Sequence, residues 1–164
     1  MPKMWMQDKT EMDEFLAEMA FGFLGLSQGE KPYVVPMNYA YHNDRIYLHA
    51  ALKGLKLEYL NNNPSVCFTV AAMDQLIPDH GDPCNYSVRY RSVMARGKAR
   101  LLLDPDEKIN ALAVLAAKYA KGPASSPIDP KKAQVTSVIV IDIEEMTGKY
   151  NQAVPPVTSG GRFV

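Results

Sequence analysis

Short runs of apolar, aromatic and β-branched residues recur along most of the chain, a pattern typical of β-strands. Turn residues separate these runs, as in the segments Gln28–Lys31 and His42–Asp44. Because many runs follow one another through short turns and not through helices, they favour an antiparallel sheet closed into a barrel over a doubly wound parallel sheet. The pattern predicts strands at residues 21–26, 32–41, 45–50, 65–72, 86–103 (one bent strand or two) and 136–143.

Three other segments have the apolar spacing of helices. Thr10 is expected to cap the first helix, and the second covers roughly residues 53–62. The third helix starts at Asp104-Pro105 and runs to about Ala120, and a loop is expected over residues 121–130. The fold class is therefore mainly β (α+β), with one domain over residues 1–153, flanking helices and a C-terminal tail over residues 154–164. The apolar face of the first helix is formed by Met12, Phe15, Leu16 and Met19.

Composition excludes several classes of function. The 18 Lys and Arg residues balance 18 Asp and Glu residues, which argues against a general nucleic-acid binder but leaves a small anionic ligand open. Cys67 and Cys84 form no CxxC pair and no metal-ligand spacing with the histidines, so we expect reduced thiols in a cytoplasmic protein and no metal site. No apolar run reaches the roughly 18 residues that would span a bilayer, and we expect no membrane association.

One turn carries the chemistry of an anion site. In the segment YLHAALKGLKLEYL a strand ends near His49 and a helix begins after Lys53-Gly54. Free N–H groups at a helix start, the helix dipole, Lys53 and Lys56 would together attract a phosphate, and Gly54 would let it approach the backbone. The alternative is an exposed amphipathic helix whose lysines are solvated.

Two further segments could contact a cofactor. A flavin ring needs an apolar wall with backbone or amide partners, and the strand Val35-Pro36-Met37-Asn38-Tyr39 offers this mixture; Pro36 also marks a sheet edge, a bulge or a site of ligand approach. In the segment Tyr90–Val93, Arg91 and Ser92 could reach a phosphate or the ribityl chain, with surface ion pairing as the alternative for Arg91. His49 could bind a cofactor or transfer a proton, or it could be structural.

Taken together, these pieces resemble the pyridoxamine 5′-phosphate oxidase-like FMN-binding split-barrel superfamily, and within it the nitroimidazole-resistance-type branch. The resemblance rests on the set FGFLGLSQGEKPYVVPMNYAY, RIYLHAALKGLKLEYLNNNPSVCFTV and YRSVMARGKARLLLDPDEKINALAVLAAKY, which lies between Phe21 and Tyr119. No arginine and histidine motif comparable with that of a true pyridoxamine phosphate oxidase follows Ile143.

The resemblance implies a six-stranded antiparallel Greek-key split β-barrel and a homodimer with FMN at the subunit interface. It implies that residues 35–39 line the ring and that Lys53 and Lys56, near Gly54, hold the phosphate, with Ser92 and Val93 nearby. It also places His49 next to the cofactor or a small ligand. The expected function is an FMN-dependent oxidoreductase that acts on a small electron acceptor, for example a nitro-aromatic compound. A non-catalytic flavin-binding protein and a haem-binding or haem-utilisation protein, with His49 or His42 on the iron, are the alternatives.

Overall fold

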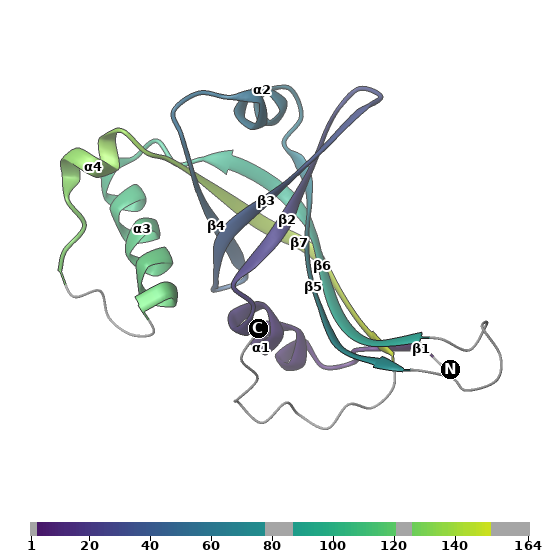
Figure 1. Cartoon of the computed structure of the whole chain (residues 1–164). Coiled ribbons are helices and arrows are strands. Elements are labelled where there is room, and N and C mark those ends of the chain that lie inside the picture. Colours follow the sequence, from purple (N-terminus) through teal and green to yellow (C-terminus); the bar gives the residue numbers. More distant parts are fainter. Residues whose placement is uncertain (1–2, 78–86, 121–125, 152–164) are drawn as a thin grey trace.

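The computed structural model describes residues 3–77, 87–120 and 126–151 (Figure 1). This part of the chain contains seven strands and four helices. The strands are β1 (Lys3–Trp5), β2 (Phe21–Gln28), β3 (Lys31–His42), β4 (Arg45–Ala50), β5 (Ser65–Ile77), β6 (Ser87–Leu101) and β7 (Ser137–Asn151). The helices are α1 (Lys9–Glu18), α2 (Leu55–Asn62), α3 (Pro105–Ala120) and α4 (Pro130–Gln134).

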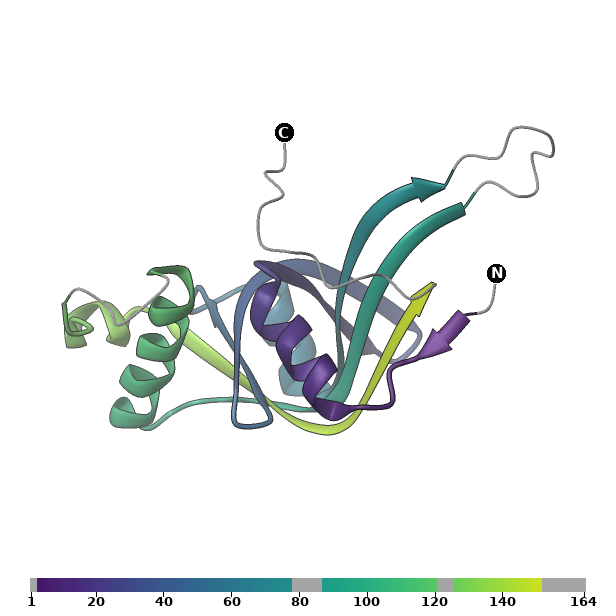
Figure 2. The same ribbon diagram turned by 90° about the horizontal axis from the view of Figure 1, so that it is seen from below.

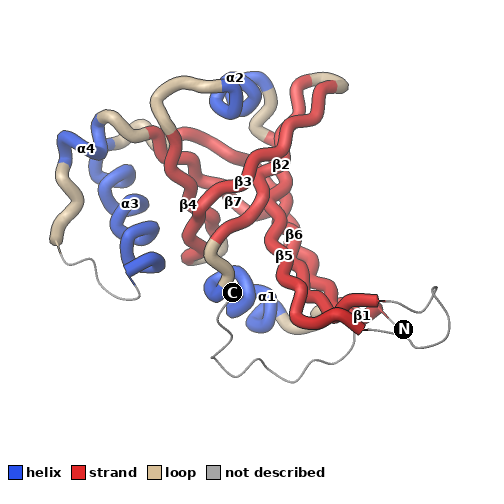
Figure 3. Tube along the Cα trace, viewed as in Figure 1, coloured by secondary structure: helices blue, strands red, loops and turns tan. Residues whose placement is uncertain are grey.

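Six of the strands form a closed ring in which every pairing is antiparallel. The sheet order is β1-β7-β4-β3-β2-β5-β6, and an additional β7–β6 pairing closes the ring. Strand β1 is not part of the ring and pairs with residues 149–151 of β7. Strands β2, β3 and β4 follow one another, and β5 returns through α2 to lie beside β2, which is a Greek-key connection. The predicted six-stranded antiparallel Greek-key barrel is confirmed, and the ring of strands is visible in Figure 3.

The main core fills the barrel. Alternate residues of each strand point inward, so that Leu24, Tyr39 and Phe68 have no exposed surface, and the Tyr39 and Phe68 rings pack 4.8 Å apart. Helix α1 lies against the barrel (Figure 2). Its predicted apolar residues Phe15 and Leu16 are buried in this same core.

A second, smaller core lies outside the barrel, where α3 covers β4 and β7. It is formed by Leu102, Ala111, Val138 and Val140, with Tyr47 packed against them. Asp104 fixes the start of α3 as predicted, because its carboxylate accepts hydrogen bonds from the N–H groups of Asp106 and Glu107.

Most predicted elements are confirmed, although several extend further. The β3–β4 turn places Asn43 and Asp44 at φ 51° and 58°, the geometry that two-residue hairpins prefer. Strands β5 and β7 are longer than predicted, the segment predicted as one bent strand or two contains the single strand β6, and β1 and α4 were not predicted. The first helix is capped by Asp8, not by Thr10, because the Asp8 carboxylate accepts from the Thr10 N–H. Cys84 and His80 lie outside the described residues.

Candidate functional site

The start of α2 has the geometry expected of an anion site. Gly54 is its N-terminal cap residue, with φ 142° and ψ 165°, a conformation that residues with a side chain rarely adopt. No side chain of the described residues caps this end, and a Cβ on Gly54 would meet nothing within 4 Å. The carbonyl of Gly54 accepts from the N–H groups of Leu57 and Glu58, which leaves the N–H groups of Leu55 and Lys56 directed away from the helix.

Two lysines flank these free N–H groups. Lys53 is exposed and Lys56 is half-buried, and neither forms an ion pair with any residue in the described part of the chain. The helix is held in place by its buried residues Leu57, Tyr59 and Leu60, and the ring of Tyr59 packs 5.3 Å from that of Tyr33 in β3. This turn can therefore bind an anion without breaking an existing contact.

The neighbouring strand β3 has an open edge next to this turn. Residues 31–38 pair with β2 only, because the pairing with β4 begins at Tyr39 and Leu48. In the two-residue hairpin closed by Gln28 and Lys31, the alternation of hydrogen-bonded pairs directs the backbone groups of Val34 and Asn38 toward the open edge. Pro36 lies between them and loses no ladder bond, so of the three alternatives considered for it the structure shows the sheet edge.

The predicted ring-lining segment is divided by the pleat of β3. Pro36 and Asn38 are exposed on the outer face of the barrel, whereas Val35, Met37 and Tyr39 point inward. Met37 and Tyr39 are buried in the core, and the Tyr39 hydroxyl donates to the carbonyl of Leu16. Their side chains therefore do not form the outer wall, and only their backbone could contact a ligand at the surface.

His49 lies on the outer face of β4. It is exposed and pairs with Val138 of β7, and the β3–β4 register, continued beyond its last pair, places it opposite Asn38. The two strands separate at this point, so His49 and Asn38 stand on either side of the opening. The structure thus brings Pro36, Asn38 and His49 to one face of the barrel, at the end where the chain continues into the α2 turn.

The segment Arg91–Val93 does not join this group within one chain. Three steps along the sheet separate β6 from β3, since the order is β3-β2-β5-β6. Val93 is fully buried in the core, and Ser92 is half-buried. The Arg91 guanidinium lies 3.3 Å from Asp74, 3.6 Å from Glu18 and 4.8 Å from the centre of the Phe15 ring. The structure thus shows ion pairing of Arg91, as in the alternative considered for it, but the pair with Asp74 is largely buried and not at the surface.

The sequence interpretation missed an apolar patch on the outer face of β2, β3, β5 and β6. It contains Phe21, Phe23, Val34, Met73 and Met94, which are 55%, 42%, 61%, 60% and 36% exposed. The register joins these strands, since Phe23 pairs with Pro36 and Thr69, and Thr69 pairs with Met94. The segment FGFLGLSQ could have revealed this patch, because large apolar residues occur at its odd and at its even positions, which face opposite sides of the sheet.

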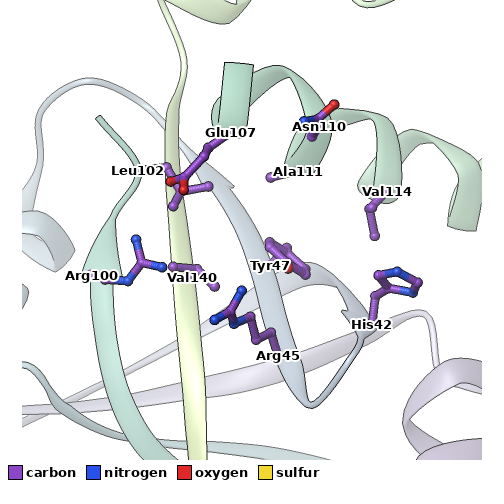
Figure 4. Close-up of a pocket in the computed structure, with 10 residues that line it drawn as sticks. All are labelled: His42, Arg45, Tyr47, Arg100, Leu102, Glu107, Asn110, Ala111, Val114 and Val140. Atoms are coloured by element: carbon purple, nitrogen blue, oxygen red, sulfur yellow. The ribbon is translucent and has the colours of Figure 1, made fainter. Parts of the chain in front are cut away.

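A cavity of about 280 Å³ lies elsewhere, between α3 and the outer face of β4, β6 and β7 (Figure 4). His42 lines it, but none of the other predicted site residues does. In the described ranges no group of three or more His, Cys, Asp or Glu residues could hold a metal ion. No described helix is both long and apolar enough to cross a bilayer.

Comparisons with known proteins agree with this fold. The family model described as pyridoxamine 5′-phosphate oxidase matches residues 8–150. A candidate 5-nitroimidazole antibiotic resistance protein from Bacteroides thetaiotaomicron is 32% identical, with a TM-score of 0.80 over 91% of this chain and 87% of that one. A search of the curated proteins finds no match.

More distant solved structures share the fold. A flavocytochrome from Azotobacter vinelandii is 22% identical, with a TM-score of 0.77 over 94% of this chain and 72% of that one. An FAD and haem binding protein from Mycobacterium smegmatis is 19% identical, with a TM-score of 0.78 over 96% of this chain and 80% of that one.

Proposed function

This chain belongs to the pyridoxamine 5′-phosphate oxidase-like family, and we propose that it is a cytoplasmic, homodimeric FMN-binding oxidoreductase. The observation that carries the proposal is the uncapped, lysine-flanked start of α2 beside the open edge of β3. The structural neighbours whose descriptions name a flavin or haem support a cofactor on this fold.

The turn before α2 would hold the phosphate. A phosphate there would accept hydrogen bonds from the N–H groups of Leu55 and Lys56, and it would lie against Gly54, where no Cβ stands in the way. Lys53 and Lys56 would supply positive charge from either side. The donor set fits a phosphate group because it combines free backbone N–H groups with two cations that have no partner among the described residues.

The open edge of β3 would hold the ring system. The pyrimidine side of a flavin presents hydrogen-bond donors and acceptors in one row. The free backbone N–H and C=O groups of Val34 and Asn38 can form hydrogen bonds with both kinds. When bound, FMN would supply the electron transfer. The chain's own groups would orient it, and His49, across from Asn38, would donate a proton to an acceptor on the exposed ring face or orient that acceptor.

A second copy of the chain would complete the site. The apolar patch around Phe21, Phe23 and Val34 adjoins Pro36 and Asn38, and large exposed apolar patches mark interaction surfaces. Ser92, which lies three strands from β3 in its own chain, could reach the cofactor from the partner across a two-fold interface. Burial of this patch would also exclude water from one side of the ring.

A flavin titration tests the phosphate assignment. We expect Lys56→Ala to weaken FMN binding by about tenfold or more, since a charge-assisted hydrogen bond contributes roughly 1.5–3 kcal/mol. Riboflavin has no phosphate, so its affinity should be nearly the same for both proteins. Lys132→Ala, which removes an exposed lysine of α4, is the matched control and should leave FMN binding unchanged. Equal losses of affinity for FMN and for riboflavin would show that Lys56 does not bind the phosphate.

Steady-state assays separate catalysis from simple flavin binding. With NADH or NADPH and a nitro-aromatic acceptor, the oxidoreductase proposal predicts turnover well above that of the same concentration of free FMN, and a slower rate for His49→Ala. Turnover equal to that of free FMN would favour a non-catalytic flavin-binding protein. The haem alternative would instead give a strong band at about 400 nm.

A further inference from the structure

The cavity beneath α3 has a polar end and an apolar wall. Tyr47 of β4 and Val140 of β7 form part of its floor, and Ala111 and Val114 of α3 form part of its roof. Figure 4 shows Arg45 and Arg100 at one end, with His42 at the other end and Tyr47 between them. Its volume of about 280 Å³ is close to the lower end of the range of small-ligand pockets.

The two arginines retain donors after their internal ion pairs are formed. Both use Nε to contact the same carboxylate: Arg45 Nε lies 2.7 Å from one oxygen of Asp142, and Arg100 Nε lies 3.3 Å from the other. A guanidinium carries five N–H donors, so Nη donors of both residues remain available even though Arg45 also hydrogen-bonds Tyr47. Two positive charges share one negative charge here, which leaves an excess of one positive charge at this end.

A carboxylate on the opposite wall provides the balancing charge. Glu107 lies in the first turn of α3 and lines the cavity, and Asn110 follows it by three residues, on the same face of the helix. Within the described ranges Glu107 has no ion pair, so it is not within 4.0 Å of either arginine. Figure 4 shows Glu107 on the α3 side of the cavity, near Arg100, so the carboxylate faces the arginines of the sheet, with an apolar surface alongside.

We propose that this cavity is a binding site for a free α-amino acid with a small apolar side chain. The ligand carboxylate would meet the free Nη groups of Arg45 and Arg100, and its ammonium group would meet Glu107. Its side chain would lie against Tyr47 and Val114. A zwitterion matches the charges of the cavity as a whole, because the ligand adds no net charge to a site whose two arginines already balance Asp142 and Glu107.

This site is separate from the proposed flavin site. Its lining residues include none of the groups at the α2 turn or at the open edge of β3. Amino-acid binding and flavin binding can therefore be measured separately in one preparation of flavin-loaded protein, and either proposal can fail without the other.

Calorimetric titration with three matched probes tests the proposal. L-leucine carries both charges, 4-methylpentanoate lacks the ammonium group, and 3-methylbutylamine lacks the carboxylate. We expect saturable binding of L-leucine in the millimolar range or tighter, and at least about tenfold weaker binding of each of the other two. No saturable binding of L-leucine up to about 10 mM, or equal binding of L-leucine and 4-methylpentanoate, would overturn the proposal.

Three variants assign the binding to this cavity. Arg100→Gln should weaken L-leucine binding by about tenfold or more, and Glu107→Gln should remove most of the preference for L-leucine over 4-methylpentanoate. Arg96→Gln is the matched control, because Arg96 lies on the same strand, also contacts a carboxylate, that of Glu145 at 3.1 Å, and is outside the cavity. Binding that Arg100→Gln and Glu107→Gln leave unchanged would place the ligand elsewhere and refute the assignment.

Discussion

The hydroxyl of Tyr119 takes the place of one backbone hydrogen-bonded pair between β2 and β3, and its removal should measurably destabilise the protein. The last backbone pair of the ladder is Phe21 with Asn38, so the next pair would join Ala20 to Tyr39. Instead the Tyr119 hydroxyl accepts from the Tyr39 N–H at 2.9 Å and lies 2.7 Å from the carbonyl of Ala20, to which it donates. The C-terminal end of α3 is thereby fixed to the strands that bound the opening beside Asn38.

Tyr119→Phe removes only this oxygen atom. It leaves a backbone N–H and a carbonyl without their partner, for which a cost of about 1–3 kcal/mol is typical when the groups are buried. Because the Tyr119 side chain is 41% exposed, water can replace part of the loss, and we expect about 1–2 kcal/mol. For a chain of this length that corresponds to a fall in Tm of roughly 2–8 °C.

Urea unfolding measures this effect, with Tyr33→Phe as the control. The Tyr33 hydroxyl forms no hydrogen bond with the described residues, so its removal should change the free energy of unfolding by less than about 0.5 kcal/mol. The m-value should be unchanged in both variants. Equal stabilities of Tyr119→Phe and the wild type would show that the hydroxyl does not replace a ladder bond.

Three further predictions follow from other parts of the molecule. Burial lowers the pKa of Lys118 to about 8, so above that pH the folded protein binds fewer protons than the unfolded protein. In thermal unfolding, the stability of the wild type relative to Lys118→Met should therefore rise from about pH 8 to 10. Phe23→Asp should convert the proposed dimer to monomers in light scattering and also weaken the proposed FMN binding, whereas Leu103→Asp, at a residue that is 84% exposed outside the patch, should do neither. Gly97→Ala should reduce the free energy of unfolding by about 3 kcal/mol or more in urea, because its Cβ would collide with the Asp142 carbonyl, a backbone atom that cannot move aside.

The strand pattern could be predicted because local signals are strong in this chain. The Asn43-Asp44 turn, the Asp104-Pro105 helix start and the alternation in the segment RIYLHA each identify an element from a few neighbouring residues. The sequence alone predicts the cap of α1 two residues too late, because Asp8 and Thr10 are both good caps and only the Thr10 N–H bond to Asp8 distinguishes them. The short elements β1 and α4 have too few residues to show a period.

The candidate site was predicted in part. The glycine and lysine spacing around Gly54 is local, and the structure shows the expected helix start there. The orientation of residues 35–39 depends on the pleat, which sends Met37 and Tyr39 into the core and leaves Pro36 and Asn38 outside. The ion pairs of Arg91 join α1, β5 and β6, and the cavity beneath α3 combines residues from β3, β4, β6, β7 and α3, so neither could be found without the tertiary fold.

The absorbance spectrum of the concentrated protein as purified, from about 300 to 600 nm, tests the central claim most directly. We predict two bands at about 375 and 450 nm, the signature of an oxidised flavin, with close to one FMN per subunit and with much less flavin retained by Lys56→Ala. A colourless protein that also fails to take up added FMN would contradict the account. It would leave the barrel in place but remove the flavin from it.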